Sequence, residues 1–191
     1  GSGTTYNVAV SGMTGSGTVI AAIPAGNAQD AAGNSNANST STDNTVTYDA
    51  TALTVIINQA AAQADPTNVS PIDFTVVFSK AVTGFTNTDV ALTGTAGATT
   101  AVVTGSGTTY NVAVSSMTGS GTVIATIPAG VAQDASGNGN AASTSTDNSV
   151  LYDITAPTVT INQAAVQADP TNATPINCTV VFSTSVTGFT G

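Results

Sequence analysis

Short apolar runs that alternate with polar residues recur along the chain, and glycine-rich turns separate them. The clearest run is Ile72–Ser79, in which Ile72, Phe74, Val76 and Phe78 alternate with smaller or polar residues. This period of two predicts a β-strand with one buried face. No window carries a sustained period of 3.6 residues, and the helix-favouring residues Glu, Lys and Arg are nearly absent. The pattern therefore predicts an all-β protein.

Seven short strands are predicted within about 100 residues, the number and span that are typical of an immunoglobulin-like β-sandwich. In chain order they cover Thr54–Asn58, Ile72–Ser79, Asp89–Thr93, Thr99–Thr104, Thr109–Ser115, Thr122–Ile127 and Ser149–Tyr152. A β-barrel is the alternative architecture. Because the chain has one cysteine and no tryptophan, an antibody-type domain with its disulfide is excluded.

The sequence repeats with a period of 104 residues, since GSGTTYNVAV begins at Gly1 and again at Gly105. The repeat predicts three units in tandem. These are the C-terminal half of a domain over residues 1–50, a complete domain over 51–154 and the N-terminal third of another over 155–191. An odd number of up-and-down strands brings the chain in at one pole and out at the other. The units are therefore expected to join head to tail.

The incomplete outer units leave two interpretations open. The chain is either a stretch of a longer tandem array, or its end segments complement those of neighbouring chains and form a polymer. The aligned copies also predict core positions. Cys178 stands where Phe74 stands in the other copy, so a buried and inert thiol is expected. The four tyrosines, Tyr6 and Tyr110 among them, are expected in cores as well.

Aspartates are expected to gather at the two poles of the complete domain. Asp134, in the loop before the last strand, is predicted to lie near Asp49 at the incoming linker. Asp65 is predicted to lie near Asp153 at the outgoing linker. Carboxylate, amide and backbone oxygens are the ligands that calcium prefers, so an interdomain Ca²⁺ site is one hypothesis. The other is turn chemistry, because Asp, Asn and Gly form tight turns without a metal.

The net charge and the residue types argue against several classes of function. The net charge of −9, with a single cationic side chain, argues against nucleic acid as a partner, because phosphate binding requires Lys and Arg. No apolar run approaches the roughly 20 residues of a membrane span, so no membrane insertion is expected. The chain has no histidine, which excludes Ser/His/Asp and Cys/His catalytic arrangements. We expect no enzymatic activity and no cofactor besides calcium.

Three stretches carry a family resemblance: TAPTVTINQA, ADPTNATPINCTVVFSTSVTGFTG and TVIATIPAGVAQDASGNGNAASTSTDNSVLYD. They resemble the bacterial immunoglobulin-like repeats of very large surface adhesins, and the resemblance covers essentially the whole chain. It implies an extracellular or cell-surface location and a role as spacer or fibre, often stiffened by calcium. The repeat itself predicts the partners, which are neighbouring identical repeats in the same chain or in adjacent subunits.

Three functions therefore follow from the sequence as hypotheses. The first is a non-catalytic structural repeat of an extracellular stalk, adhesin or fibre. The second is the subunit of an extracellular filament that assembles head to tail through complementing incomplete domains. The third is a glycan- or surface-binding module, which would call for exposed aromatic residues in a cleft. The near-identical repeats and the absence of tryptophan favour the first.

Overall fold

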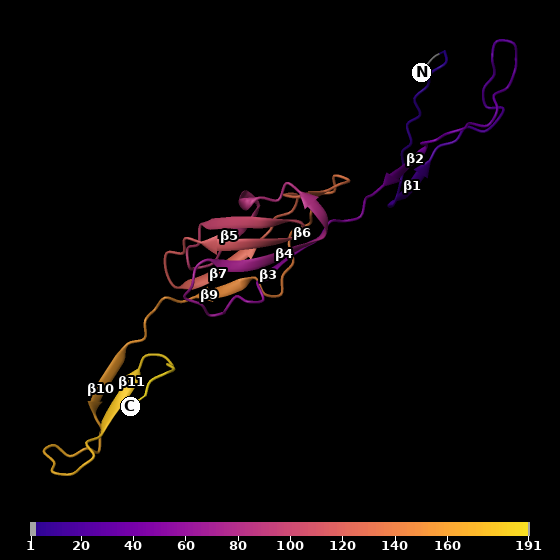
Figure 1. The fold of residues 1–191 in the computed structure, drawn as a ribbon. Helices are drawn as coiled ribbons and strands as arrows, with labels where there is room; N and C mark the ends of the chain where they lie inside the picture. The colour runs from indigo at the N-terminus through magenta and orange to yellow at the C-terminus, as the bar shows by residue number, and fades with distance from the viewer. Residues whose placement is uncertain (1–2, 191) are drawn as a thin grey trace.

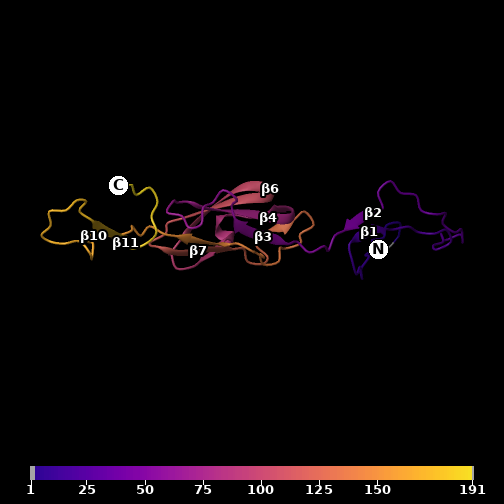
Figure 2. The same cartoon turned by 90° about the horizontal axis from the view of Figure 1, so that it is seen from below.

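The computed structural model describes residues 3–190 as three parts in a row, which Figures 1 and 2 show from two directions. A central unit spans residues 53–153. The N-terminal and C-terminal segments lie beyond its opposite ends. Within the described residues the regular structure is β except for one turn of 3₁₀ helix, η1 (Asn87–Asp89). None of the described helical structure is long and apolar enough to cross a membrane.

Two antiparallel sheets form the central unit. Its strands, in chain order, are β3 (Val55–Gln59), β4 (Ile72–Thr83), β5 (Ala91–Thr93), β6 (Thr100–Ser115), β7 (Gly121–Thr126), β8 (Gln133–Asp134) and β9 (Ser149–Tyr152). One sheet has the order β3-β4-β6, with β8 paired to the end of β4, and the other has the order β5-β7-β9. The all-β prediction is confirmed.

The two sheets enclose one apolar core, to which alternate residues of their strands contribute. The buried strand residues are Val55, Ile57, Ile72, Phe74, Val76, Phe78, Val82, Tyr110, Val112, Val114, Val123, Ala125 and Val150. Ile56 and Val77, between these positions, are exposed, as the period of two predicts. Phe78, Phe85 and Tyr110 pack edge to face with ring centroids 5.1–5.8 Å apart.

Strand β6 doubles back on itself. A straight strand of 16 residues would separate its ends by roughly 50 Å. The ends nevertheless lie side by side: the hydroxyl oxygens of Thr100, at the start of β6, and Ser116, just after its end, are 2.9 Å apart. The reversal falls at Gly105 and Gly107, whose φ angles of +117° and +70° suit glycine. The two limbs correspond to the fourth and fifth strands that the sequence predicts.

Two details of the sheets differ from the predictions. The third predicted strand, Asp89–Thr93, begins only at Ala91, because the Asp89 carboxylate accepts hydrogen bonds from the backbone N–H and hydroxyl of Thr86. The backbone bond belongs to a capping box at η1, so these residues form a helical turn instead of a strand. The short strand β8 was not predicted. It pairs Asp134 with Val82, so Asp134 lies on a sheet edge rather than in a free loop.

The outer segments repeat two strand pairs of the central unit. In the N-terminal segment, β1 (Gly17–Ile20) and β2 (Thr45–Tyr48) pair as β7 and β9 do. In the C-terminal segment, β10 (Val159–Gln163) and β11 (Cys178–Phe182) pair as β3 and β4 do. The register is the same in each case, because each pair is displaced by one repeat.

Burial, in contrast, is not repeated in the outer segments. Tyr6 and Cys178 were predicted to be core residues, and both are exposed. Their counterparts Tyr110 and Phe74 are buried in the central unit. The difference arises because no second sheet packs on the apolar side of either outer segment within the described chain. The prediction of the inward face rested on the repeat, whereas burial depends on the partner sheet.

Candidate functional site

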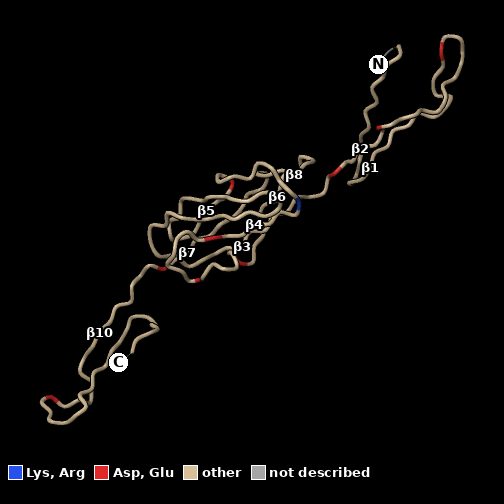
Figure 3. The backbone as a smooth tube through the Cα atoms, in the orientation of Figure 1, with Lys and Arg blue, Asp and Glu red and all other residues tan. Residues whose placement is uncertain are grey.

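The incoming pole of the central unit holds an ion-pair cluster centred on Lys80. Its Nζ lies 2.7 Å from Asp49 Oδ2 and 2.9 Å from Asp134 Oδ2. It also donates a hydrogen bond of 3.2 Å to the carbonyl oxygen of Thr51. Figure 3 shows this basic residue, in blue, at the end of the central unit where the N-terminal segment joins. Lys80, on β4, therefore joins the incoming linker to Asp134 on β8.

The path of β4 explains why Lys80 reaches the linker. The pairing of β4 with β6 is regular up to Val77 and resumes at Val82, and Lys80 lies in the irregular stretch between them. Such a bulge bends a strand and re-aims its side chains. Val82 then pairs with Asp134 on β8, which places the carboxylate beside the ammonium group.

The Asp134 carboxylate also organises its own turn. Its Oδ1 accepts hydrogen bonds from the backbone N–H groups of Ser136 and Asn138, at 2.9 and 3.0 Å. The Asn138 side chain donates to Asp134 Oδ2 and to the carbonyl oxygen of Asp49. Asp134 is only 6% exposed, so each of these partners replaces water.

These contacts shift the pKa values at the pole in the directions that strengthen the ion pairs. The hydrogen bond from Lys80, followed by that from the Asn138 side chain, lowers the pKa of Asp134 to about 2. Lys80, assisted by Thr51, holds the pKa of Asp49 well below its usual range. The two carboxylates in turn raise the pKa of Lys80. All three groups are therefore charged at neutral pH.

The outgoing pole repeats the turn but not the lysine. Asp153 Oδ1 accepts hydrogen bonds from the backbone N–H of Thr155 and the hydroxyl of Ser120, and the Thr155 bond lowers its pKa. At the incoming linker Asp49, Thr51 and Ser16 form the same arrangement. The counterpart of Lys80 in the C-terminal segment is Thr184.

Asp65 lies at the outgoing pole, where it serves the end of β9. Its Oδ1 accepts a hydrogen bond of 2.9 Å from the backbone N–H of Leu151. The neighbouring Thr67 forms a bridge with Tyr152, and its carbonyl oxygen accepts from the N–H of Asp153. The loop that holds Asp65 and Thr67 therefore contacts the backbone from Leu151 to Asp153.

The aspartate carboxylates that could bind calcium already have partners at both poles, but the partners differ. At the incoming pole the lysine ammonium already contacts both carboxylates, so an ion there would have to displace it. At the outgoing pole the oxygens of Asp65 and Asp153 accept hydrogen bonds from backbone N–H groups. Within residues 3–190 no three Asp, Glu, His or Cys side chains are grouped as a metal site requires. Calcium at the junctions stays a prediction.

Sequence reasoning brought Asp49 and Asp134 to the same pole but did not include Lys80. The available signal was the single lysine of the chain at the end of a predicted strand. A strand bulge cannot be read from the alternation of residues, so the direction of its side chain was not predicted.

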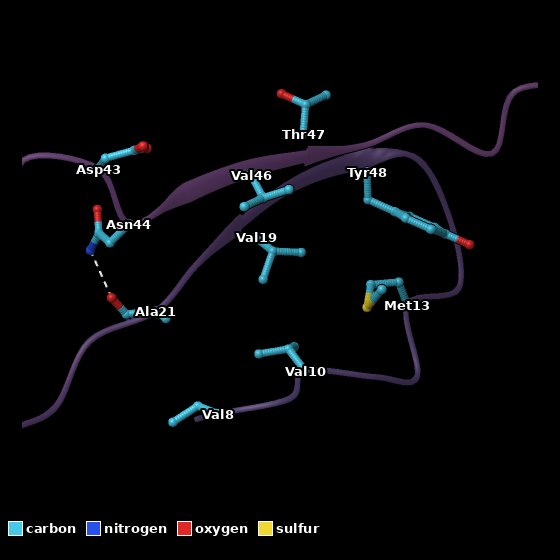
Figure 4. Close-up of a pocket in the computed structure, with 10 residues that line it drawn as sticks. All are labelled: Val8, Val10, Met13, Val19, Ala21, Asp43, Asn44, Val46, Thr47 and Tyr48. Carbon is cyan, nitrogen blue, oxygen red and sulfur yellow. Dashed lines mark hydrogen bonds between the residues drawn. The ribbon is translucent and has the colours of Figure 1, made fainter. Parts of the chain in front are cut away.

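An apolar hollow lies in the N-terminal segment (Figure 4). The residues that line it are Val8, Val10, Met13, Val19, Ala21, Asp43, Asn44, Val46, Thr47 and Tyr48. Several of their counterparts are core residues of the central unit, including Val112, Val114, Val123, Ala125 and Val150. The hollow has one carboxylate and mainly aliphatic walls, so it has the chemistry of an uncovered core rather than of a catalytic pocket.

Comparison of the chain with protein-family models, with curated proteins and with solved structures found no match. The resemblance to immunoglobulin-like adhesin repeats therefore rests on the sequence motifs alone.

Proposed function

We propose that this protein is a non-catalytic structural repeat of an extracellular stalk, adhesin or fibre, built from immunoglobulin-like sandwiches joined head to tail. One observation carries the proposal: the chain enters and leaves the central unit at opposite poles. Asp49 in the incoming linker is bound by Lys80, whereas Asp153 at the outgoing linker is bound by Ser120. A repeat with this connectivity extends the chain with every copy (Figures 1 and 2).

The linkers support this role, because each is short and is held to its unit by side chains. Lys80 and Asn138 fix the backbone carbonyl oxygens of Thr51 and Asp49, and Ser120 accepts a hydrogen bond from the N–H of Ile154. Short linkers that are held in this way resist bending, whereas flexible linkers behave as random coils. The spacing between units would therefore be preserved under load.

Electron microscopy of tandem arrays of residues 53–156 tests the proposal. We expect rods whose length increases in proportion to the number of copies. A matched array, in which residues 154–156 are replaced by Gly-Ser-Gly, should bend more at each junction. Compact particles whose size does not follow the copy number would overturn the structural role.

Immunogold labelling of intact source cells tests the location. An antibody raised against the central unit should label the outside of unbroken cells, at a distance from the envelope. Labelling that requires permeabilised cells would contradict an extracellular stalk.

A further inference from the structure

Each outer segment exposes apolar residues, in its strands or beside them, whose counterparts are buried in the central unit. In the N-terminal segment Val8 is 72% exposed, whereas its counterpart Val112 is fully buried. In the C-terminal segment Ile161 is 66% exposed, whereas its counterpart Ile57 is fully buried. Exposed apolar faces of this kind mark sites of association.

The two faces are complementary to each other. The C-terminal segment corresponds to β3 and β4, and the N-terminal segment corresponds to the second limb of β6 together with β7 and β9. We propose that the C-terminal segment of one copy of this chain pairs with the N-terminal segment of a second copy, completing another two-sheet unit. This inference rests on the proposed structural function and names its partner, which is the same chain.

The register of the pairing follows from the central unit. There β4 pairs antiparallel with β6, with Phe74 opposite Val112 and Ile72 opposite Val114. The same pairing between two copies places Cys178 opposite Val8 and Ile176 opposite Val10. Every β4–β6 partner position from Gly107 to Val114 has a counterpart between Gly3 and Val10 of the described chain.

The polar contacts that join these two parts of the central unit can also form between the outer segments of two copies. In the central unit the Asn58 side-chain oxygen accepts hydrogen bonds from Ser145, Thr146 and Asp147. The counterparts of these residues are identical in type: Asn162 in the C-terminal segment, and Ser41, Thr42 and Asp43 in the N-terminal segment. The interface therefore has the same hydrogen-bonding groups as well as the same apolar face.

The outer segments together have no counterpart of Thr88–Thr104. In the central unit this stretch contains β5, at the edge of the sheet β5-β7-β9, and the first limb of β6. Its one buried apolar residue is Ala96. The paired segments therefore contain the strands that supply most of the core, and they lack β5 and the first limb of β6.

The geometry of the chain makes this association open-ended. The two segments extend beyond opposite ends of the central unit, so they do not meet within one molecule (Figure 1). A contact between two different surfaces that does not close into a ring generates a filament. We therefore expect linear head-to-tail assemblies instead of closed dimers.

Disulfide crosslinking of the full chain tests the register, because Cys178 is its only cysteine. Directly opposed strand positions lie within the Cα separation that a disulfide spans. Under oxidation, Val8→Cys should give a ladder of three or more chains on a non-reducing gel. The matched variant Ala9→Cys, whose side chain points to the other face, should not give this ladder.

Sedimentation of the full chain under reducing conditions tests the interface without crosslinks. The wild type should show sedimentation coefficients that increase with concentration. Val180→Asp puts a charge on the face that corresponds to buried Val76, and the increase should be lost. Val181→Asp is the control, because its counterpart Val77 is exposed, and this variant should assemble like the wild type.

Three results would overturn the proposal: a monomer at every concentration, equal ladders from the two cysteine variants, or equal effects of Val180→Asp and Val181→Asp. None of these results bears on the covalent tandem arrays, whose rod shape depends only on the linkers. Failure of the association is therefore distinguishable from failure of the structural function.

Discussion

Lys80 and Asp134 meet across two paired strands, with Lys80 Nζ 2.9 Å from Asp134 Oδ2. The same ammonium group lies 2.7 Å from Asp49 Oδ2, outside the central unit. One side chain therefore links an edge of the sheet to the incoming linker. The counterpart Thr184 is too short to make both contacts, so successive junctions of the chain differ in chemistry.

Replacement of Lys80 by threonine, the residue at the equivalent position of the next repeat, should destabilise the central unit. The change leaves the little-exposed carboxylate of Asp134 without its cation. We expect the melting temperature to decrease by about 2–5 °C, the range of a modest ion-pair effect in a unit of this size. Differential scanning calorimetry measures the shift.

Lys80→Arg is the matched control, because it retains the charge. Its melting temperature should lie closer to that of the wild type than to that of Lys80→Thr. Equal melting temperatures for the wild type and Lys80→Thr would show that the cluster does not contribute to stability.

Acid should weaken the same cluster. The folded-state pKa of Asp134 is lowered to about 2, from an ordinary value of 3.8, so its contribution is fully present above pH 4. It is lost as the pH decreases from about 4 to 2, because the unfolded chain binds the proton more tightly. Asp49 changes in the same direction. The melting temperature of the wild type should decrease over this range.

The difference between wild type and Lys80→Thr isolates this contribution from that of the other aspartates. The two melting temperatures should converge as the pH decreases through this window. They should also converge in strong alkali, because the raised pKa of Lys80 means that its contribution is lost only above the ordinary value of 10.5. A difference that is constant with pH would exclude the ion pairs as its cause.

Alternation and repetition predicted most of the core. Ile72 and Phe74 were assigned to the inward face from the period of two, and both are buried. The strand pattern also predicted the two limbs of β6, with a glycine-rich turn between them. These features are local, so the sequence contains them directly.

Features that depend on distant partners were not predicted. The bulge that aims Lys80 and the short strand β8 each arise from a particular tertiary contact. The exposure of Tyr6 and Cys178 likewise depends on which sheet packs on the segment. The aspartates of the poles were identified, but the cation that joins two of them was not.

Phe78→Asp should unfold the central unit. The ring is 2% exposed and packs against Phe85 and Tyr110, so the substitution buries an unpaired charge and leaves a cavity. We expect loss of the cooperative thermal transition, measured by near-ultraviolet circular dichroism. Val77→Asp is the matched control, because the adjacent side chain faces solvent and its variant should melt cooperatively. Cooperative melting of Phe78→Asp would contradict the position of Phe78 in the core.

Calcium binding at the junctions remains to be tested. The position of Lys80 gives a specific prediction for the incoming pole. At the incoming pole an ion competes with the ammonium group for the oxygens of Asp49 and Asp134. Calcium should therefore raise the melting temperature of Lys80→Thr more than that of the wild type, because the variant has two carboxylates without a cation. Calorimetry in millimolar calcium chloride and in EDTA measures both shifts.

Magnesium chloride at the same ionic strength separates binding from screening. Screening of like charges affects the variant equally with either ion, whereas a flexible oxygen site selects calcium, because magnesium demands near-ideal octahedral geometry. The triple variant Asp49→Asn, Lys80→Thr, Asp134→Asn should lose the calcium shift, since the neutral amides bind the ion less strongly. Coincident melting curves of Lys80→Thr in calcium and in EDTA would remove calcium from the incoming pole and leave the aspartates there with the turn and ion-pair roles alone.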